Sequence, residues 1–157
     1  MAYHPPDSAL LDALSDRVVV ADGAMGTMLQ AANLSLDDFA GLDGCNEILN
    51  VTRPDVVRGI HDAYFAAGSD AVETNTFGAN WANLGEYGIA ERIRELSQAA
   101  AVLAREVAHG WSTPDRPRWV LGSVGPGTKL PTLGHVPFAT LRGTEARLLN
   151  SANCVAV

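Results

Sequence analysis

The sequence is poor in cysteine, in positive charge and in long apolar runs, and each shortage excludes a class of protein. Two cysteines in 157 residues, Cys45 and Cys154, are too few for a disulfide framework. Without a C-x-x-C spacing or close histidines, they do not predict a zinc site either. The 11 Lys and Arg residues stand against 18 Asp and Glu, and the net charge of -7 argues against a nucleic-acid or anionic-membrane partner.

No run of about 18 apolar residues occurs, so we expect no segment that spans a bilayer. Residues 1–7 lack the basic start and apolar centre of a signal peptide, and we expect them to form a mobile tail. A cytoplasmic protein is therefore predicted. With 47% hydrophobic residues, the rest of the chain can bury the core of one globular domain.

Apolar runs and helical spacing alternate along the chain. Three runs predict strands, at about residues 17–21, at 70–73 and from Trp119 onward. The predicted helices precede these strands and run from Ser8, over 25–31, from 52–55 to Gly68 and over about 90–108. Because each strand is separated from the next by a helix, the order predicts an α/β fold with parallel strand pairing.

Local composition gives three further expectations. Residues 52–55 (Thr-Arg-Pro-Asp) have the features of a helix start, since Thr52 can cap and a proline suits the first turn. Residues 33–50 are rich in Asp and Gly and are predicted to form a surface loop. His61 and His109 lie on predicted helices among charges, where we expect them to be solvated.

Each predicted strand is followed directly by a segment of glycine and polar residues. These segments are residues 22–27 (Asp-Gly-Ala-Met-Gly-Thr), 73–78 (Glu-Thr-Asn-Thr-Phe-Gly) and 122–127 (Gly-Ser-Val-Gly-Pro-Gly). In parallel α/β sheets, ligands bind just beyond the carboxyl ends of the strands. Three such ends therefore predict one shared site assembled from separate loops.

Asp22, Gly23 and Ala24 are the leading candidates for ligand contacts. A carboxylate can accept hydrogen bonds from a substrate ammonium group, while the N–H groups of Gly23 and Ala24 can donate to a carboxylate. That combination fits the zwitterionic head of an amino acid. The alternative is an Asp-Gly turn in which Asp22 caps the helix over residues 24–31.

Other polar residues near the strand ends have two interpretations. Glu73, Asn75 and Ser123 either contact the ligand or hydrogen-bond only to neighbouring strand ends. Cys45 has no nearby base and is interpreted as a buried thiol rather than a nucleophile. His135 follows the third strand's loop and is a weak site candidate.

The three strand-end segments occur in order with residues 44–47 (Gly-Cys-Asn-Glu) and residues 52–55. Together they resemble the homocysteine-binding module of the cobalamin-dependent methionine synthases, within the zinc-dependent homocysteine S-methyltransferase family. The likeness covers about residues 9–142 and implies a TIM barrel. Because eight βα units take about 250 residues, we expect residues 8–142 to form the N-terminal part of such a barrel, about three βα units.

The resemblance also implies roles for individual residues. Asp22 and the N–H groups of Gly23 and Ala24 would hold the amino and carboxylate groups of homocysteine. Glu73, Asn75 and Ser123 would line the same barrel mouth. The resemblance implies no catalytic residue within this chain.

In the complete family enzyme, zinc held by three cysteine thiolates activates the homocysteine sulfur, and the methyl group comes from methylcobalamin. Neither Cys45 nor Cys154 matches a zinc ligand of that family, so this chain alone is expected to bind neither zinc nor cobalamin. Residues 143–157 do not align with the family, and we expect a truncated product that is inactive alone. Its open sheet edges would favour self-association or a complementing C-terminal half.

Three alternatives remain open. The chain could be a non-catalytic interaction module that binds a partner through its open strand edge. It could be half of a cobalamin-independent homocysteine methyltransferase that uses S-methylmethionine or betaine as donor. It could also be a complete small α/β protein that binds a zwitterionic metabolite.

Overall fold

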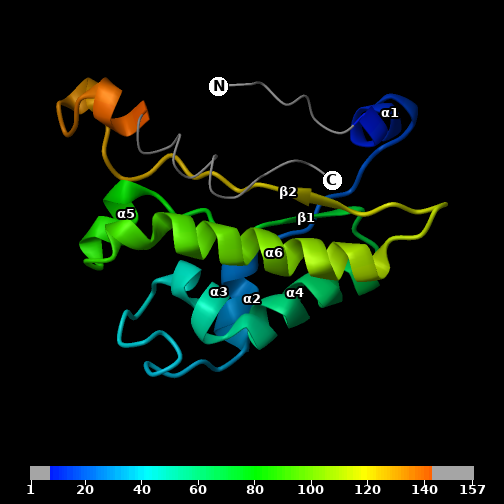
Figure 1. The fold of residues 1–157 in the computed structure, drawn as a ribbon, viewed down its shortest axis with the longest axis horizontal. Coiled ribbons are helices and arrows are strands. Elements are labelled where there is room, and N and C mark those ends of the chain that lie inside the picture. The colour runs from blue at the N-terminus through cyan, green and yellow to red at the C-terminus, as the bar shows by residue number, and fades with distance from the viewer. Residues whose placement is uncertain (1–7, 143–157) are drawn as a thin grey trace.

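The computed structural model describes residues 8–142, which form a mixed α/β unit with an open sheet (Figure 1). Short 3-10 turns occur at Asn46–Ile48, Ala90–Arg92 and Pro131–Leu133. The helices and strands, in chain order, are α1 (Ser8–Asp16), α2 (Met25–Ala31), α3 (Leu49–Thr52), α4 (Pro54–Ala67), β1 (Ala71–Glu73), α5 (Trp81–Glu86), α6 (Ile93–Trp111) and β2 (Trp119–Leu121).

Two of the three predicted strands form as expected. β1 and β2 pair in parallel, with Ala71 opposite Trp119 and Glu73 opposite Leu121. The prediction of a first strand at residues 17–21 is wrong in extent, because only a single parallel bridge, from Ala21 to Ala71, forms there. Val20 marks the pairing, since its carbonyl accepts from the N–H of Ala71 at 3.2 Å. β1 thus lies between β2 and the extended segment around residue 20.

Most of the helices cover one side of the strands, whereas α1 packs Leu10 against Ala71 and Trp119 on the other side. Figure 1 shows α4 and α6 side by side beneath the sheet, with α2 and α3 next to α4 on the same side. Apolar residues at helical spacing bury this interface, for example Val57 and Phe65 of α4 and Leu96 and Leu103 of α6.

In contrast, Val18 is 82% exposed and Val20 is 52% exposed. Alternation along the strands puts Val18 and Val20 on the same side as Val72, which faces α4 and α6. Their exposure therefore marks the edge of the sheet beyond β1, which the described helices leave uncovered.

Helix α4 begins one residue later than the sequence predicts. Arg53, not Thr52, is the residue before Pro54, and no side chain caps this helix. Thr52 ends α3 instead, and its hydroxyl donates to the carbonyl of Ile48 at 3.1 Å. Gly68 closes the helix as predicted, with a left-handed φ of 111° that suits glycine.

The end of the predicted surface loop at residues 33–50 is buried. Cys45, Ile48 and Leu49 are completely inaccessible to solvent, and Asn50 is buried as well. Cys45, Ile48 and Leu49 belong to the core between α3, α4 and α6. The surface prediction therefore holds only for the earlier part of this loop, and residues 45–50 are part of the scaffold beneath the site.

The prediction for His61 is also wrong. Its side chain is fully buried, and neither ring nitrogen has a hydrogen-bond partner among the described residues. Burial lowers the pKa of His61 to about 4, although the nearby Asp62 carboxylate opposes the shift. His109 is exposed on α6, as expected. Of the helices formed by residues 8–142, none is both long and apolar enough to cross a membrane.

Candidate functional site

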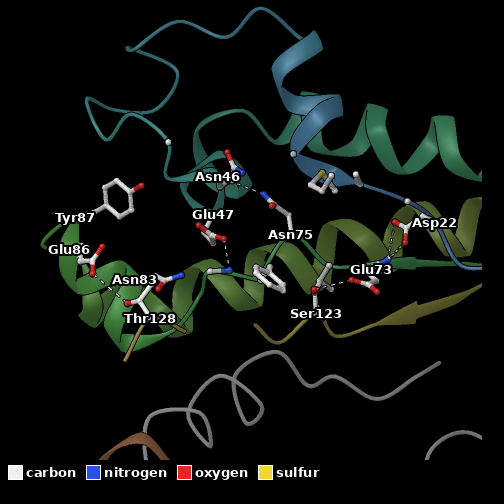
Figure 2. Close-up of a pocket in the computed structure, with 18 residues that line it drawn as sticks. Asp22, Asn46, Glu47, Glu73, Asn75, Asn83, Glu86, Tyr87, Ser123 and Thr128 are labelled. Carbon is white, nitrogen blue, oxygen red and sulfur yellow. Dashed lines mark hydrogen bonds between the residues drawn. The ribbon is translucent and has the colours of Figure 1, made fainter. Parts of the chain in front are cut away.

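A cavity of about 530 Å³ opens at the carboxyl ends of β1 and β2. All six residues proposed from the sequence line it, although they come from three separate segments: Asp22, Gly23, Ala24, Glu73, Asn75 and Ser123 (Figure 2). The parallel pairing brings these loops to one edge, as the sequence predicts. Their role as ligand contacts stays a prediction.

Asp22 accepts a hydrogen bond from the neighbouring strand rather than from its own helix. Both of its carboxylate oxygens lie 3.0 Å from the N–H nitrogen of Glu73. The alternative that Asp22 caps α2 is wrong, since Ala24 precedes that helix and no side chain caps it. Burial raises the pKa of Asp22 to about 6, with a further contribution from the Glu73 carboxylate. At neutral pH the carboxylate is therefore mostly charged and can accept from an ammonium group.

Gly23 and Ala24 offer unused donors beside this carboxylate. Within residues 8–142, the N–H groups of Gly23 and Ala24 have no hydrogen-bond acceptor. An anionic group that entered the cavity here would supply the missing acceptors. The loop thus places one negative charge next to two free N–H donors.

Glu73 and Ser123 connect the ends of the two strands while lining the cavity. The Ser123 hydroxyl donates to Glu73 Oε2 at 2.9 Å, and the Ser123 N–H donates to Thr74 Oγ1 at 3.1 Å. Thr76 completes the link, because its hydroxyl donates to the Ser123 carbonyl at 2.7 Å. Both sequence-based interpretations of Glu73 and Ser123 are thus compatible with one geometry.

Asn75 is held in a buried amide network. Its Nδ2 donates to the Asn46 carbonyl at 2.8 Å and to Asn50 Oδ1 at 3.1 Å. Asn50 in turn donates from Nδ2 to the Asn75 carbonyl at 2.9 Å. Because its amide hydrogens are used by the protein, Asn75 can offer a ligand only its oxygen.

Glu47 is a buried wall residue that sequence reasoning missed. It accepts from the N–H of Gly78 at 2.7 Å, and burial raises its pKa. A Cβ on Gly78 would lie 2.6 Å from Glu47 Oε1, so this contact requires glycine. Behind Glu47, Cys45 is fully buried with a raised pKa, which agrees with an unreactive thiol. The sequence signal that could have identified Glu47 is its place in the Gly-Cys-Asn-Glu motif at residues 44–47.

The cavity is negatively charged and elongated. Figure 2 shows Asp22 and Glu73 at one end and Glu86 and Tyr87 at the other. Asp22, Glu47, Glu73 and Glu86 all line it, and no lysine, arginine or histidine of residues 8–142 does. This charge favours a ligand that carries an ammonium group. His135 is outside the lining, where its Nδ1 accepts from the Leu130 N–H at 3.2 Å.

The model of the family described as homocysteine S-methyltransferase matches residues 19–150. This chain belongs to the homocysteine S-methyltransferase family. It is 65% identical over 147 residues to methionine synthase from Mycobacterium tuberculosis and 63% identical to that from Mycobacterium leprae. Each match covers 92% of this chain and 12% of the relative. The chain thus spans about 12% of the length of those methionine synthases.

The fold of this homocysteine S-methyltransferase chain is similar to that of solved structures. It resembles the homocysteine methyltransferase MmuM from Escherichia coli in its oxidized form, with a TM-score of 0.66 and 23% identity. The metallated form gives a TM-score of 0.68 at 22% identity. The chain covers 53% and 51% of these two structures, so its open sheet corresponds to about half of that fold.

The described residues of this family member do not fit a zinc site. Among residues 8–142, no three His, Cys, Asp or Glu side chains are placed to hold a metal ion. Cys45 is alone in the core, and Cys154 lies outside the described residues. A site of three thiolates, which the resemblance implies for the complete enzyme, has no counterpart here.

Proposed function

We propose that this chain is the homocysteine-binding part of a homocysteine S-methyltransferase barrel, made of about three βα units. The observation that carries the proposal is that the Asp22 carboxylate lies beside the free N–H groups of Gly23 and Ala24 at one end of the cavity. The carboxylate suits the ammonium group of homocysteine, and the N–H groups suit its carboxylate. Glu73, Asn75 and Ser123 line the same space.

In the complete enzyme, the reaction is methyl transfer to the homocysteine sulfur, which yields methionine. Zinc supplies thiolate activation in that family, and cobalamin supplies the methyl group in methionine synthase. Because the described residues do not fit the zinc ligands, we expect this chain alone to bind the amino acid without methylating it. A cobalamin-independent enzyme remains the alternative, because the amino-acid end of the site is compatible with either donor.

We also propose that the open sheet receives the C-terminal half of the barrel. Val18 and Val20 are exposed at the uncovered edge beyond β1, and within the described residues β2 pairs only with β1. A parallel sheet with an open edge and an apolar face gains stability when further strands and helices cover it. A non-catalytic interaction module would use the same surface with an unrelated partner.

Calorimetric titration of the chain with L-homocysteine tests the first proposal. We expect binding to the unmodified chain and a loss of about tenfold or more in Asp22→Asn, because a charged hydrogen bond to the ammonium group is removed. Asp37→Asn is the matched control, since Asp37 is an exposed loop residue outside the cavity. Binding that is the same in both variants would contradict the proposal, as would no binding at all.

Size-exclusion chromatography tests the second proposal. The chain is mixed with the separately produced C-terminal half of a related homocysteine S-methyltransferase barrel. A one-to-one complex that gains methyl transfer supports the complementing half. Val20→Asp should weaken that complex, because it places a charge in the apolar contact. Self-association that excludes the added half would contradict this partner.

A further inference from the structure

Tyr64 lies outside the cavity lining, yet it touches the backbone of the proposed homocysteine loop. It projects from α4, is half-buried, and packs against both of the core clusters beneath the sheet. Its hydroxyl donates to the carbonyl oxygen of Ala24 at 3.2 Å. The contact joins residues 40 positions apart in the sequence.

The tyrosine ring also fixes the space beside Gly23. A Cβ built on Gly23 would lie 3.1 Å from the Tyr64 hydroxyl oxygen and 3.4 Å from its Cε1. Ring and hydroxyl therefore contact both residues whose N–H groups have no acceptor. Gly23 has the largest backbone freedom of any residue type, so an unsupported loop would sample other orientations of these donors.

A second hydroxyl reaches the same carbonyl but cannot anchor the loop. Thr27 donates to the Ala24 carbonyl at 3.3 Å from within the same segment, so it moves with the loop. Tyr64 belongs to α4, whose Val57, Ile60 and Phe65 are buried in the core. It therefore connects the loop to the rigid part of the molecule, and rigid donors bind a ligand without an ordering cost.

We propose that Tyr64 is a positioning residue for the carboxylate of homocysteine. Its ring and hydroxyl hold the backbone of Gly23 and Ala24 so that the two N–H groups converge on that carboxylate. The inference rests on the proposed function and adds a residue that does not itself contact the ligand. It predicts that Tyr64 matters only for ligands that carry a carboxylate.

The test compares two ligands on Tyr64→Phe by calorimetric titration. L-homocysteine carries the carboxylate, whereas 3-aminopropane-1-thiol keeps the amine and thiol but lacks it. Tyr64→Phe should weaken homocysteine binding about three- to tenfold, the range of one neutral hydrogen bond. The aminothiol should bind the variant and the unmodified chain within about twofold, since Asp22 is untouched. Thr52→Val, which removes a hydroxyl-to-carbonyl hydrogen bond outside the cavity, is the matched control and should change neither affinity.

The outcomes separate the inference from the function on which it rests. Absence of homocysteine binding by the unmodified chain overturns the proposed function and this inference together. Normal homocysteine binding by Tyr64→Phe, or equal weakening of both ligands, overturns the inference alone. If Tyr64→Phe melts early, Gly23→Ala replaces it, because the added Cβ crowds the Tyr64 hydroxyl. The same selective loss of homocysteine supports the proposal, and its absence overturns it.

Discussion

Replacing Asp22 with asparagine separates the effect of its negative charge from that of its hydrogen bond to Glu73. The substitution keeps an oxygen that can accept from the Glu73 N–H, where both Asp22 oxygens now lie at 3.0 Å. It removes the negative charge that burial and the Glu73 carboxylate disfavour. We therefore expect Asp22→Asn to be more stable at neutral pH than the unmodified chain, although it binds homocysteine less well.

The magnitude follows from the pKa of Asp22, about 6 in the folded chain against 3.8 as its ordinary value. Between these values the folded state binds more protons than the unfolded state, so stability falls as pH rises from about 4 to about 6. A difference of about two pH units corresponds to about 3 kcal/mol. Because Asp22 is partly exposed, solvent screening reduces the expected effect to about 1–2 kcal/mol.

Urea denaturation, followed by circular dichroism at several pH values, measures this effect. Asp22→Asn should gain about 1–2 kcal/mol of unfolding free energy above about pH 6 and nothing near pH 4. Asp37→Asn controls for the loss of one negative charge from an acidic chain. The reasoning is refuted if Asp22→Asn is less stable at neutral pH, or if its advantage does not depend on pH.

Two further substitutions probe the scaffold. Gly78→Ala should lower the unfolding free energy by about 1–3 kcal/mol, because its Cβ would lie 2.6 Å from Glu47 Oε1. Gly85→Ala, which meets no atom within 4 Å, should not be destabilised in the same urea assay; equal losses would contradict the steric account. His61→Leu should add about 1–3 kcal/mol at neutral pH, since it removes two buried ring nitrogens without partners. The pKa of His61 is about 4 in the folded chain against an ordinary value of 6.5, so the unfolding free energy decreases as pH falls between these values. If His61→Leu shows the same decrease, its assignment to His61 is refuted.

The sequence predicted which loops meet at the cavity better than it predicted the details of the scaffold. Strand ends carry local signals, because glycine and polar residues follow short apolar runs, and parallel pairing then brings Asp22, Glu73 and Ser123 together. The burial of Glu47 has no such local signal. It depends on a contact with Gly78, which lies 31 residues later in the chain.

His61 could have been placed correctly from its spacing. It lies four residues after Val57 and four before Phe65, both buried, so it belongs to the apolar stripe of α4. The charges beside it in the sequence were misleading, since neighbouring residues on a helix face different directions. In contrast, the position of Thr52 could not be read from the local sequence. It ends α3 and does not start α4, because its hydroxyl bonds to the Ile48 carbonyl.

The missing first strand has a physical cause in the open sheet. Val18 and Val20 are exposed, and residues 17–21 pair with β1 along one edge only. A strand gains regularity from partners on both edges and from cover on both faces. We expect residues 17–21 to become a regular strand when a complementing half closes the barrel.

An amide NMR titration with L-homocysteine tests the central claim most directly, since it reports the N–H groups of Gly23 and Ala24 individually. We expect saturable shifts at these two signals, while the signal of Gly110, which does not line the cavity, stays unchanged. Asp22→Asn should raise the homocysteine concentration at the midpoint of these shifts about tenfold or more, without unfolding the chain. Saturating homocysteine that leaves both signals in place, or moves signals elsewhere, would contradict the assignment of this loop as the amino-acid site.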